Sequence, residues 1–178
     1  MGVRDIHLLG SPVLRQRADE VAGIDDEVRS LIDDMFETMG VACGVGLAAN
    51  QVGVARRVAV INAEGQTFAM INPVIVEENG RAGGEEGCLS IPDAYAEVTR
   101  PESIVLEALD EDGKPFRLEA NGLVARAVQH EIDHLDGVLF VDHLSPMKRQ
   151  LLVTRWKKEH RGEGLTRTPR PEESEAGN

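Results

Sequence analysis

The stretch 122-GLVARAVQHEIDHLD-136 predicts one helix that supplies both core contacts and chemistry. Apolar residues recur along it three and four positions apart, which gives a helix one face for packing. These residues are Leu123, Val124, Ala127, Val128 and Leu135. Asn121 stands at the N-cap position and Gly137 stands where helices commonly stop. We therefore expect this helix at the centre of the fold.

The same helix contains the pattern HExxH. His130 and His134 lie one turn apart on one face, so both imidazoles can bind a single ion. Glu131 flanks that ion without binding it, where a general base can take a proton from an activated water. The plainer alternative is a helix whose histidines pack or face solvent. The apolar periodicity, which turns this helix toward a core, favours the metal site.

A third metal ligand does not come from the longer pattern HExxHxxGxxH, because Phe140 occupies its last position. The downstream candidates are Asp136, Asp142, His143 and Glu159. Upstream, the segment 85-EEGCLSIPD-93 offers Cys88, and a thiolate is a good ligand for a first-row metal. A tetrahedral ion on one cysteine and two histidines would keep a fourth position for water, as catalytic sites do.

The rest of the chain predicts a single α+β domain with mostly antiparallel strands packed around the HExxH helix. The expected elements are helices at 25–40 and 145–160, strands at 57–63 and 67–77, and a hairpin at 104–120 with Asp-Gly in its turn. We expect the domain to span residues 1–161. The segment 162–178 is acidic and holds almost nothing apolar, so we expect it to be disordered.

Composition and charge limit the cellular setting. No apolar run is long enough to cross a membrane and no secretory signal precedes the domain, so we expect a cytoplasmic protein without membrane contact. The net charge of −12 argues against generic nucleic-acid binding. Cys43 lies in the small-residue run 41-VACGVG-46, where we expect an inert, buried thiol.

Three motifs occur in order and resemble those of the peptide deformylases: GVGLAANQ at 44–51, EGCLS at 86–90 and QHEIDHLDG at 129–137. The similarity extends across residues 1–160. It implies a metal-dependent hydrolase that removes the N-formyl group from the N-terminal methionine of newly made proteins and releases formate. It also implies one Fe²⁺ per chain, with Ni²⁺, Co²⁺ or Zn²⁺ as possible substitutes, although the ligand types alone would suggest zinc.

The resemblance also implies roles for individual residues. It gives Glu131 the role of general acid and base, and it assigns the formyl oxygen to Gln51 and the backbone N–H of Leu89. The metal ligands that it implies are Cys88, His130 and His134. The expected substrate-binding residues are Val45, Gly46, Leu47, Glu86, Leu123, Arg126 and Ala127. Plain core packing is the alternative for these substrate-binding residues.

Several further expectations concern the surroundings of the site. Asn50 and Tyr95 depart from the commonest family pattern, and we expect both departures to affect substrate-edge contacts only. Asp133 could orient a histidine, pair with Arg100, or be a surface acid.

The C-terminal helix is expected to be basic. The segment 145–161 carries six basic residues and one acidic residue. In some deformylases the C-terminal helix docks on the ribosome, so these basic residues could bind ribosomal RNA; a solvated helix face is the plainer interpretation. We expect a monomer.

Two rival functions remain open from the residues alone. A metallopeptidase shares HExxH, but it is opposed by the missing third histidine and by the EGCLS thiolate. A structural-metal protein that binds peptide N-termini would need a fourth protein ligand, and it would leave Glu131 without a task.

Overall fold

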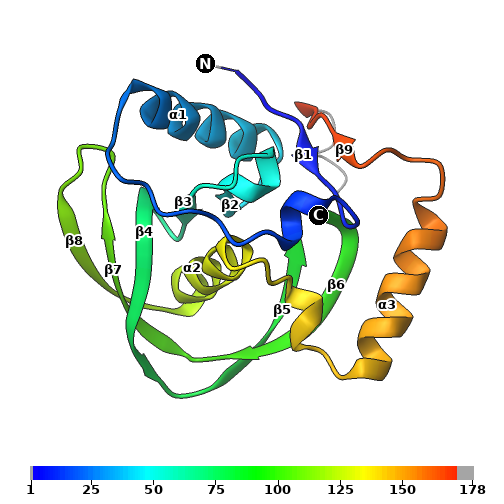
Figure 1. Cartoon of the computed structure of the whole chain (residues 1–178). Helices are drawn as coiled ribbons and strands as arrows, with labels where there is room; N and C mark the ends of the chain where they lie inside the picture. Colours follow the sequence, from blue (N-terminus) through cyan, green and yellow to red (C-terminus); the bar gives the residue numbers. More distant parts are fainter. Residues whose placement is uncertain (1, 172–178) are drawn as a thin grey trace.

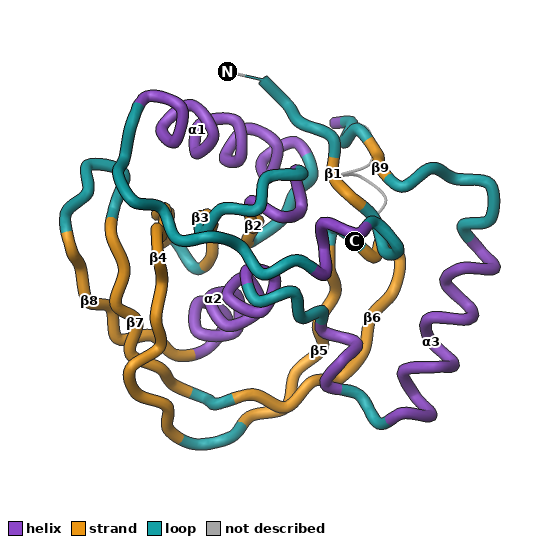
Figure 2. The backbone as a smooth tube through the Cα atoms, viewed as in Figure 1, coloured by secondary structure: helices purple, strands orange, loops and turns teal. Residues whose placement is uncertain are grey.

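The computed structural model describes residues 2–171 and has an α+β architecture with α2 (Gly122–Leu135) at its centre. Figure 1 shows α2 enclosed by α1, by the large sheet and by a smaller hairpin. The large sheet has five antiparallel strands in the order β2-β3-β4-β7-β8. They are β2 (Gly46–Ala48), β3 (Val58–Ala63), β4 (Gln66–Asn79), β7 (Ser103–Leu109) and β8 (Pro115–Asn121). Figure 2 shows the strands curving around α2.

The apolar face of α2 forms the centre of the core, as its periodicity predicts. Val124, Val128 and Leu135 are buried against sheet residues that include Ile61 and Leu106. Complete burial of an aliphatic side chain of this size contributes about 1.5–3 kcal/mol, so this face strongly stabilises the position of the helix.

Both ends of α2 lie where they were expected. Asn121 stands at the N-cap, although its side chain makes no capping hydrogen bond. Gly137 follows the helix with φ +75°, and a Cβ there would lie 2.7 Å from the carbonyl oxygen of Arg15. Glycine is therefore required where the chain turns away from the helix.

Helix α1 (Asp26–Val41) covers the other side of the sheet's first strands. Val28, Leu31 and Met35 are buried in a cluster with Val58 and Val60 of β3. Asp25 caps the helix by accepting a hydrogen bond from the backbone N–H of Val28 at 2.9 Å.

Cys43, which follows α1, corrects an expectation from the sequence. The predicted buried thiol is exposed, and the residue adopts φ 55° in the turn after the helix.

Two smaller pairs of strands complete the fold. Strands β5 (Ala82–Cys88) and β6 (Ile91–Arg100) form a separate antiparallel hairpin that the sequence did not predict. Strand β1 (Ile6–His7) pairs with β9 (Thr166–Arg167) near the C-terminal end of the described chain. The expectation of a disordered segment 162–178 is therefore wrong where β9 forms, and residues 172–178 lie outside the described range.

Helix α3 (Pro146–Glu159) leans against the outside of the β5–β6 hairpin (Figure 1). Its Trp156 is buried and donates an indole hydrogen bond to the carbonyl oxygen of Pro92 at 2.8 Å. Ser145 caps the helix through the backbone N–H of Lys148, as the Ser-Pro start predicts. Short 3₁₀ turns at Pro12–Arg15, Ala49–Val52 and Phe140–His143 connect the elements. No helix within residues 2–171 is long and apolar enough to cross a bilayer.

Candidate metal centre and active site

Three side chains that can bind a metal converge beside the C-terminal half of α2. The ligand atoms of Cys88, His130 and His134 all lie within 4.8 Å of one another. The Nε2 atom of His134 is 3.3 Å from the Cys88 sulfur and 3.2 Å from the Nε2 atom of His130. Helical spacing brings the histidines together, and Cys88 reaches them from the end of β5. No other such group occurs in the described chain, and Asp136, Asp142, His143 and Glu159 do not join this one.

Glu86 fixes the orientation of His130. Its Oε1 accepts a hydrogen bond from the His130 Nδ1 at 2.9 Å, so Nε2 of that ring faces the other ligands. Arg100 donates to the two Glu86 oxygens at 2.6 and 2.9 Å, and Arg126 donates to Oε2 at 2.6 Å. Burial alone would raise the pKa of Glu86, but hydrogen bonds from His130 and Arg100 hold it far below its usual range. Glu86 is therefore a buried carboxylate anion.

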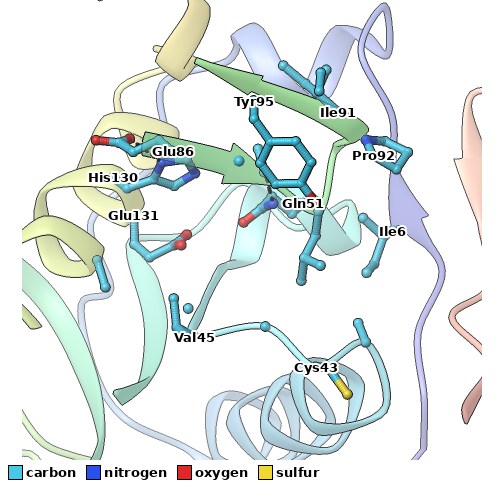
Figure 3. A pocket seen from close by; sticks show the side chains of 18 of the residues that line it. Ile6, Cys43, Val45, Gln51, Glu86, Ile91, Pro92, Tyr95, His130 and Glu131 are labelled. Carbon is cyan, nitrogen blue, oxygen red and sulfur yellow. Dashed lines mark hydrogen bonds and ion pairs between the residues drawn. The ribbon is translucent and has the colours of Figure 1, made fainter. Parts of the chain in front are cut away.

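Burial also sets the charge of the groups beside Glu86. Desolvation by burial, together with the positive charge of Arg100, holds the pKa of His134 well below its usual range, so this imidazole is neutral, as metal binding requires. Burial raises the pKa of Glu131 to about 7. Within the described chain, the Glu131 Oε2 atom has no hydrogen-bond partner. Its carboxylate points into the cavity (Figure 3), where it can exchange a proton near neutral pH.

Gln51 faces Glu131 across the same cavity (Figure 3). Its Oε1 accepts from the backbone N–H of Ala48 at 2.9 Å, which assigns the amide nitrogen to the other side. That nitrogen donates to the Ser90 hydroxyl at 3.1 Å and lies 3.7 Å from the Cys88 sulfur. Gln51 therefore presents a fixed N–H donor beside the metal ligands.

The cavity has a volume of about 410 Å³ and lies between β2 and the β5–β6 hairpin. Strand β2 is an edge strand of the large sheet, so one side of its backbone is left for another strand. Of the expected substrate-binding residues, six line the cavity: Val45, Gly46, Glu86, Leu123, Arg126 and Ala127. Leu89 lines it as well.

Leu47 does not lie where it was expected. It is completely buried in the core cluster beneath α1 and does not line the cavity. Side chains alternate between the two faces of a strand, so Gly46 faces Glu131 whereas Leu47 faces the core.

The two departures from the family pattern have different structural settings. Asn50 is buried, and its amide donates to the carbonyl oxygens of Val13 and Gln16 at 3.4 and 2.9 Å. It holds a neighbouring segment and does not line the cavity, which corrects the expected substrate-edge role. Tyr95 is 63% exposed at the rim of the cavity, as an edge contact requires.

Further out, Asp133 pairs with Arg100 at 2.9 Å, which is one of the alternatives considered for it. His143 binds the same carboxylate at 2.7 Å, and so it packs outside the ligand group. Sequence reasoning missed several lining residues, and three of them come from the two ends of the described chain: Ile6, Arg167 and Pro169. They belong to no motif, and no local pattern marks the ends of the chain as neighbours of the cavity.

Known proteins match this chain over nearly its whole length. The family model described as polypeptide deformylase matches residues 3–150. A peptide deformylase of Alkalilimnicola ehrlichii is 51% identical over 162 residues, covering 89% of this chain and 91% of that protein. Peptide deformylase 1 of Corynebacterium glutamicum is 53% identical over 157 residues, covering 84% and 92%.

Solved structures agree with these relatives. A peptide deformylase of Legionella pneumophila superposes with a TM-score of 0.86 at 46% identity and covers 89% of this chain and 96% of its own. A peptide deformylase of Ehrlichia chaffeensis in complex with actinonin gives a TM-score of 0.86 at 39% identity, covering 90% and 99%.

Proposed function

The chain belongs to the peptide deformylase family, and on that premise we propose which of its residues carry out the reaction. The enzyme is a metal-dependent hydrolase that removes the N-formyl group from newly made proteins. The observation that carries our assignment is one cavity that contains the Cys88–His130–His134 group together with Glu131 and Gln51.

The residues present fit a bound metal ion. A thiol and two imidazoles converge, and the far nitrogen of His130 is held by a carboxylate, as is typical of metal-bound histidines. We propose that Cys88, His130 and His134 hold the ion. When bound, it acts as a Lewis acid that activates water and polarises the formyl carbonyl.

Glu131 is our candidate for the proton carrier. Its buried carboxylate takes a proton from the attacking water and returns it to the amine nitrogen as the C–N bond breaks, leaving formate and a free N-terminus. Negative charge that develops on the formyl oxygen is stabilised by N–H donors from Gln51 and the Leu89 backbone. The raised pKa of Glu131 supports this role, because a carboxyl group that titrates near neutral pH can both accept and release a proton there.

The substrate backbone is expected to extend along β2, because an edge strand can pair with an added peptide strand. Val45 and Leu123, which are 43% and 41% exposed, and the buried Ala127 offer apolar surface for the methionine side chain. Actinonin is bound in the Ehrlichia relative. We expect it to inhibit this enzyme competitively against formylated peptides.

Replacing single ligands tests the metal assignment. Cys88→Ala and His130→Ala should each lose bound metal and formate release from formyl-Met-Ala-Ser. His143→Ala is the matched control because His143 lies outside the ligand group. Full metal content in folded Cys88→Ala would overturn the assignment.

We propose Fe²⁺ as the physiological ion, at one per chain, with Ni²⁺ and Co²⁺ as active substitutes and Zn²⁺ as a poor one. The observation that supports iron is the thiolate and imidazole ligand set, which suits first-row metals. Anaerobic reconstitution with each ion, followed by metal analysis and activity, tests this. If Zn²⁺ restored the highest activity and Fe²⁺ restored little, iron would be excluded as the preferred ion.

We also propose a cytoplasmic monomer whose catalytic domain extends past the expected end at residue 161 to include β9, which pairs with β1. We further propose that α3 can dock on the ribosome. The support for docking is a set of six exposed basic side chains on α3 and directly after it: Lys148, Arg149, Arg155, Lys157, Lys158 and Arg161. Lys157→Glu/Lys158→Glu should reduce co-sedimentation with ribosomes at low salt, whereas Arg81→Glu/Lys114→Glu, away from α3, should not. Equal sedimentation of both variants would contradict the docking, and size-exclusion chromatography tests the monomer.

A further inference from the structure

The C-terminal segment returns to the substrate cavity after α3. Strand β9 pairs antiparallel with β1, in the register Ile6 to Arg167 and His7 to Thr166. Figure 1 shows this pair beside the β5–β6 hairpin. Ile6, Arg167 and Pro169 all line the same cavity that contains Glu131. The two ends of the described chain therefore form part of the wall of the active-site cavity.

The position of this segment is held by specific contacts. The backbone N–H of Leu8 donates to the carbonyl oxygen of Leu165 at 2.8 Å. The Thr168 hydroxyl donates to the carboxylate of Asp5. Pro169 is buried although its neighbours are exposed. These contacts bracket Arg167 and fix it against β1.

The wall formed by β1 and β9 lies away from the metal ligands. In Figure 3, His130 and Glu131 stand on one side of the cavity, whereas Ile6 and Pro92 stand on the other, with Tyr95 and Gln51 between them. A peptide whose formyl group lies at Glu131 and whose backbone is extended advances about 3.3 Å per residue. Residues beyond the methionine would therefore approach the side of Ile6 and Arg167.

The chemistry of this wall suits an extended peptide. Ile6 and Pro169 offer apolar surface, and Arg167 offers a guanidinium that can bind carbonyl oxygens or a carboxylate. Asp93 also lines the cavity near Pro92, and its side chain is 78% exposed. Arg167 and Asp93 thus place charges of opposite sign on the cavity lining, where they can contact side chains that follow the methionine.

We propose that the segment 165–170 is a substrate-binding element of this enzyme, and that Arg167 contacts the residues of the formylated peptide that follow its second position. The proposal rests on the assigned deformylase reaction and deepens it. The formyl group and the methionine are bound by α2, β2 and β5, and this added wall selects and holds the downstream chain.

Deletion of residues 165–178 tests the proposal with substrates of increasing length. It should raise KM for formyl-Met-Ala-Ser-Glu about three- to fivefold, the effect of a few exposed contacts. The constants for formyl-Met-Ala should stay within twofold of those of the full chain. Deletion of residues 172–178 alone is the matched control, and it should raise KM for formyl-Met-Ala-Ser-Glu less than the longer deletion does. Equal changes for short and long substrates would assign a purely structural role to the segment and overturn the proposal.

A point variant separates recognition from folding. Arg167→Glu should reduce kcat/KM for formyl-Met-Ala-Ser-Glu and increase it for formyl-Met-Ala-Ser-Lys, with formyl-Met-Ala unchanged. Arg170→Glu makes the same charge change three residues later, at an exposed position that does not line the cavity, and should leave all three substrates unchanged. An unchanged Glu-to-Lys ratio in Arg167→Glu would contradict the contact. If the unmodified enzyme failed to hydrolyse formyl-Met-Ala at all, that result would instead contradict the deformylase assignment itself.

Discussion

A Cβ atom on Gly46 would lie 2.6 Å from the Oε1 atom of Glu131 and 2.9 Å from its Cγ. Real Cβ atoms essentially never come this close to another atom, so the absence of a side chain at Gly46 leaves the space that the Glu131 carboxylate occupies. The glycine in the edge strand and the glutamate in the central helix therefore depend on each other. This contact connects the backbone of the proposed peptide-binding strand to the proposed proton carrier.

Gly46→Ala should displace the Glu131 carboxylate while leaving the metal ligands in place. We expect kcat to fall about 10–100-fold, because a displacement of about 1 Å can cost that much, with metal content unchanged. Gly23→Ala is the matched control, since a Cβ at Gly23 meets nothing within 4 Å. Formate release and metal analysis of both variants check this. Wild-type kcat in Gly46→Ala would show that the position of Glu131 is not critical.

Gln51→Ala should remove one donor to the developing oxyanion. We expect a loss of about 100–1000-fold in kcat, with little change in bound metal, because Gln51 is not a ligand. Gln150→Ala removes an exposed glutamine on α3 and should have wild-type kinetics. Loss of metal from Gln51→Ala, in proportion to the lost activity, would instead show that Gln51 holds the ligand group together.

Glu86→Gln should destabilise the fold and weaken metal binding together. It removes a buried anion that binds Arg100, Arg126 and His130, and breaking such a network costs about 3–5 kcal/mol of unfolding free energy. Metal affinity should fall about 10–100-fold because His130 loses its orienting partner. Urea unfolding and chelator competition measure the two effects. The exposed neighbour Glu85→Gln is the control, and identical results for both variants would refute the role of the network.

Asp142→Asn should lower stability in a pH-dependent way. Burial would raise the pKa of Asp142, but hydrogen bonds from Arg15 and the backbone N–H of Leu139, with the charge of Arg149, hold it below its usual range. An acid with a depressed pKa stabilises the fold above its unfolded pKa, about 3.9, and loses that contribution as the pH falls through the lower folded value.

The expected difference in unfolding free energy is about 1 kcal/mol at pH 7, as for partly exposed pairs, and it should shrink below about pH 4. Thermal or urea unfolding across this range measures it, with exposed Asp33→Asn as the control. A difference that grows on acidification would have the wrong sign for this account.

Local pattern in the sequence predicted the central helix well, together with the convergence of His130 and His134 on one of its faces. The apolar periodicity of 122–136 predicts which face of the helix is buried, and the four-residue spacing in HExxH places both histidines on one face. The β5–β6 hairpin was not predicted because 82-AGGEEGC-88 has no β-branched or aromatic residue. Its order comes from distant partners: Glu86 binds Arg100, Arg126 and His130, which no local window contains.

Other differences have the same physical origin. The polar segment around β9 has little to bury by itself, and it is ordered by pairing with β1 at the opposite end of the chain. Leu47 was expected in the groove because its motif lines the groove, but strand alternation turns it to the core. Contacts between residues distant in sequence thus decide the outer parts of the cavity, whereas helix spacing decides its centre.

The most direct test is formate release from formyl-Met-Ala-Ser by anaerobically purified, metal-loaded enzyme, with Glu131→Gln beside it. We predict rapid release by the wild type and a loss of about 100–10,000-fold in kcat for the variant, the usual contribution of a general acid and base. Both proteins should contain equal amounts of metal. Comparable release by a metal-replete Glu131→Gln enzyme, or no release by the folded wild type, would contradict the account.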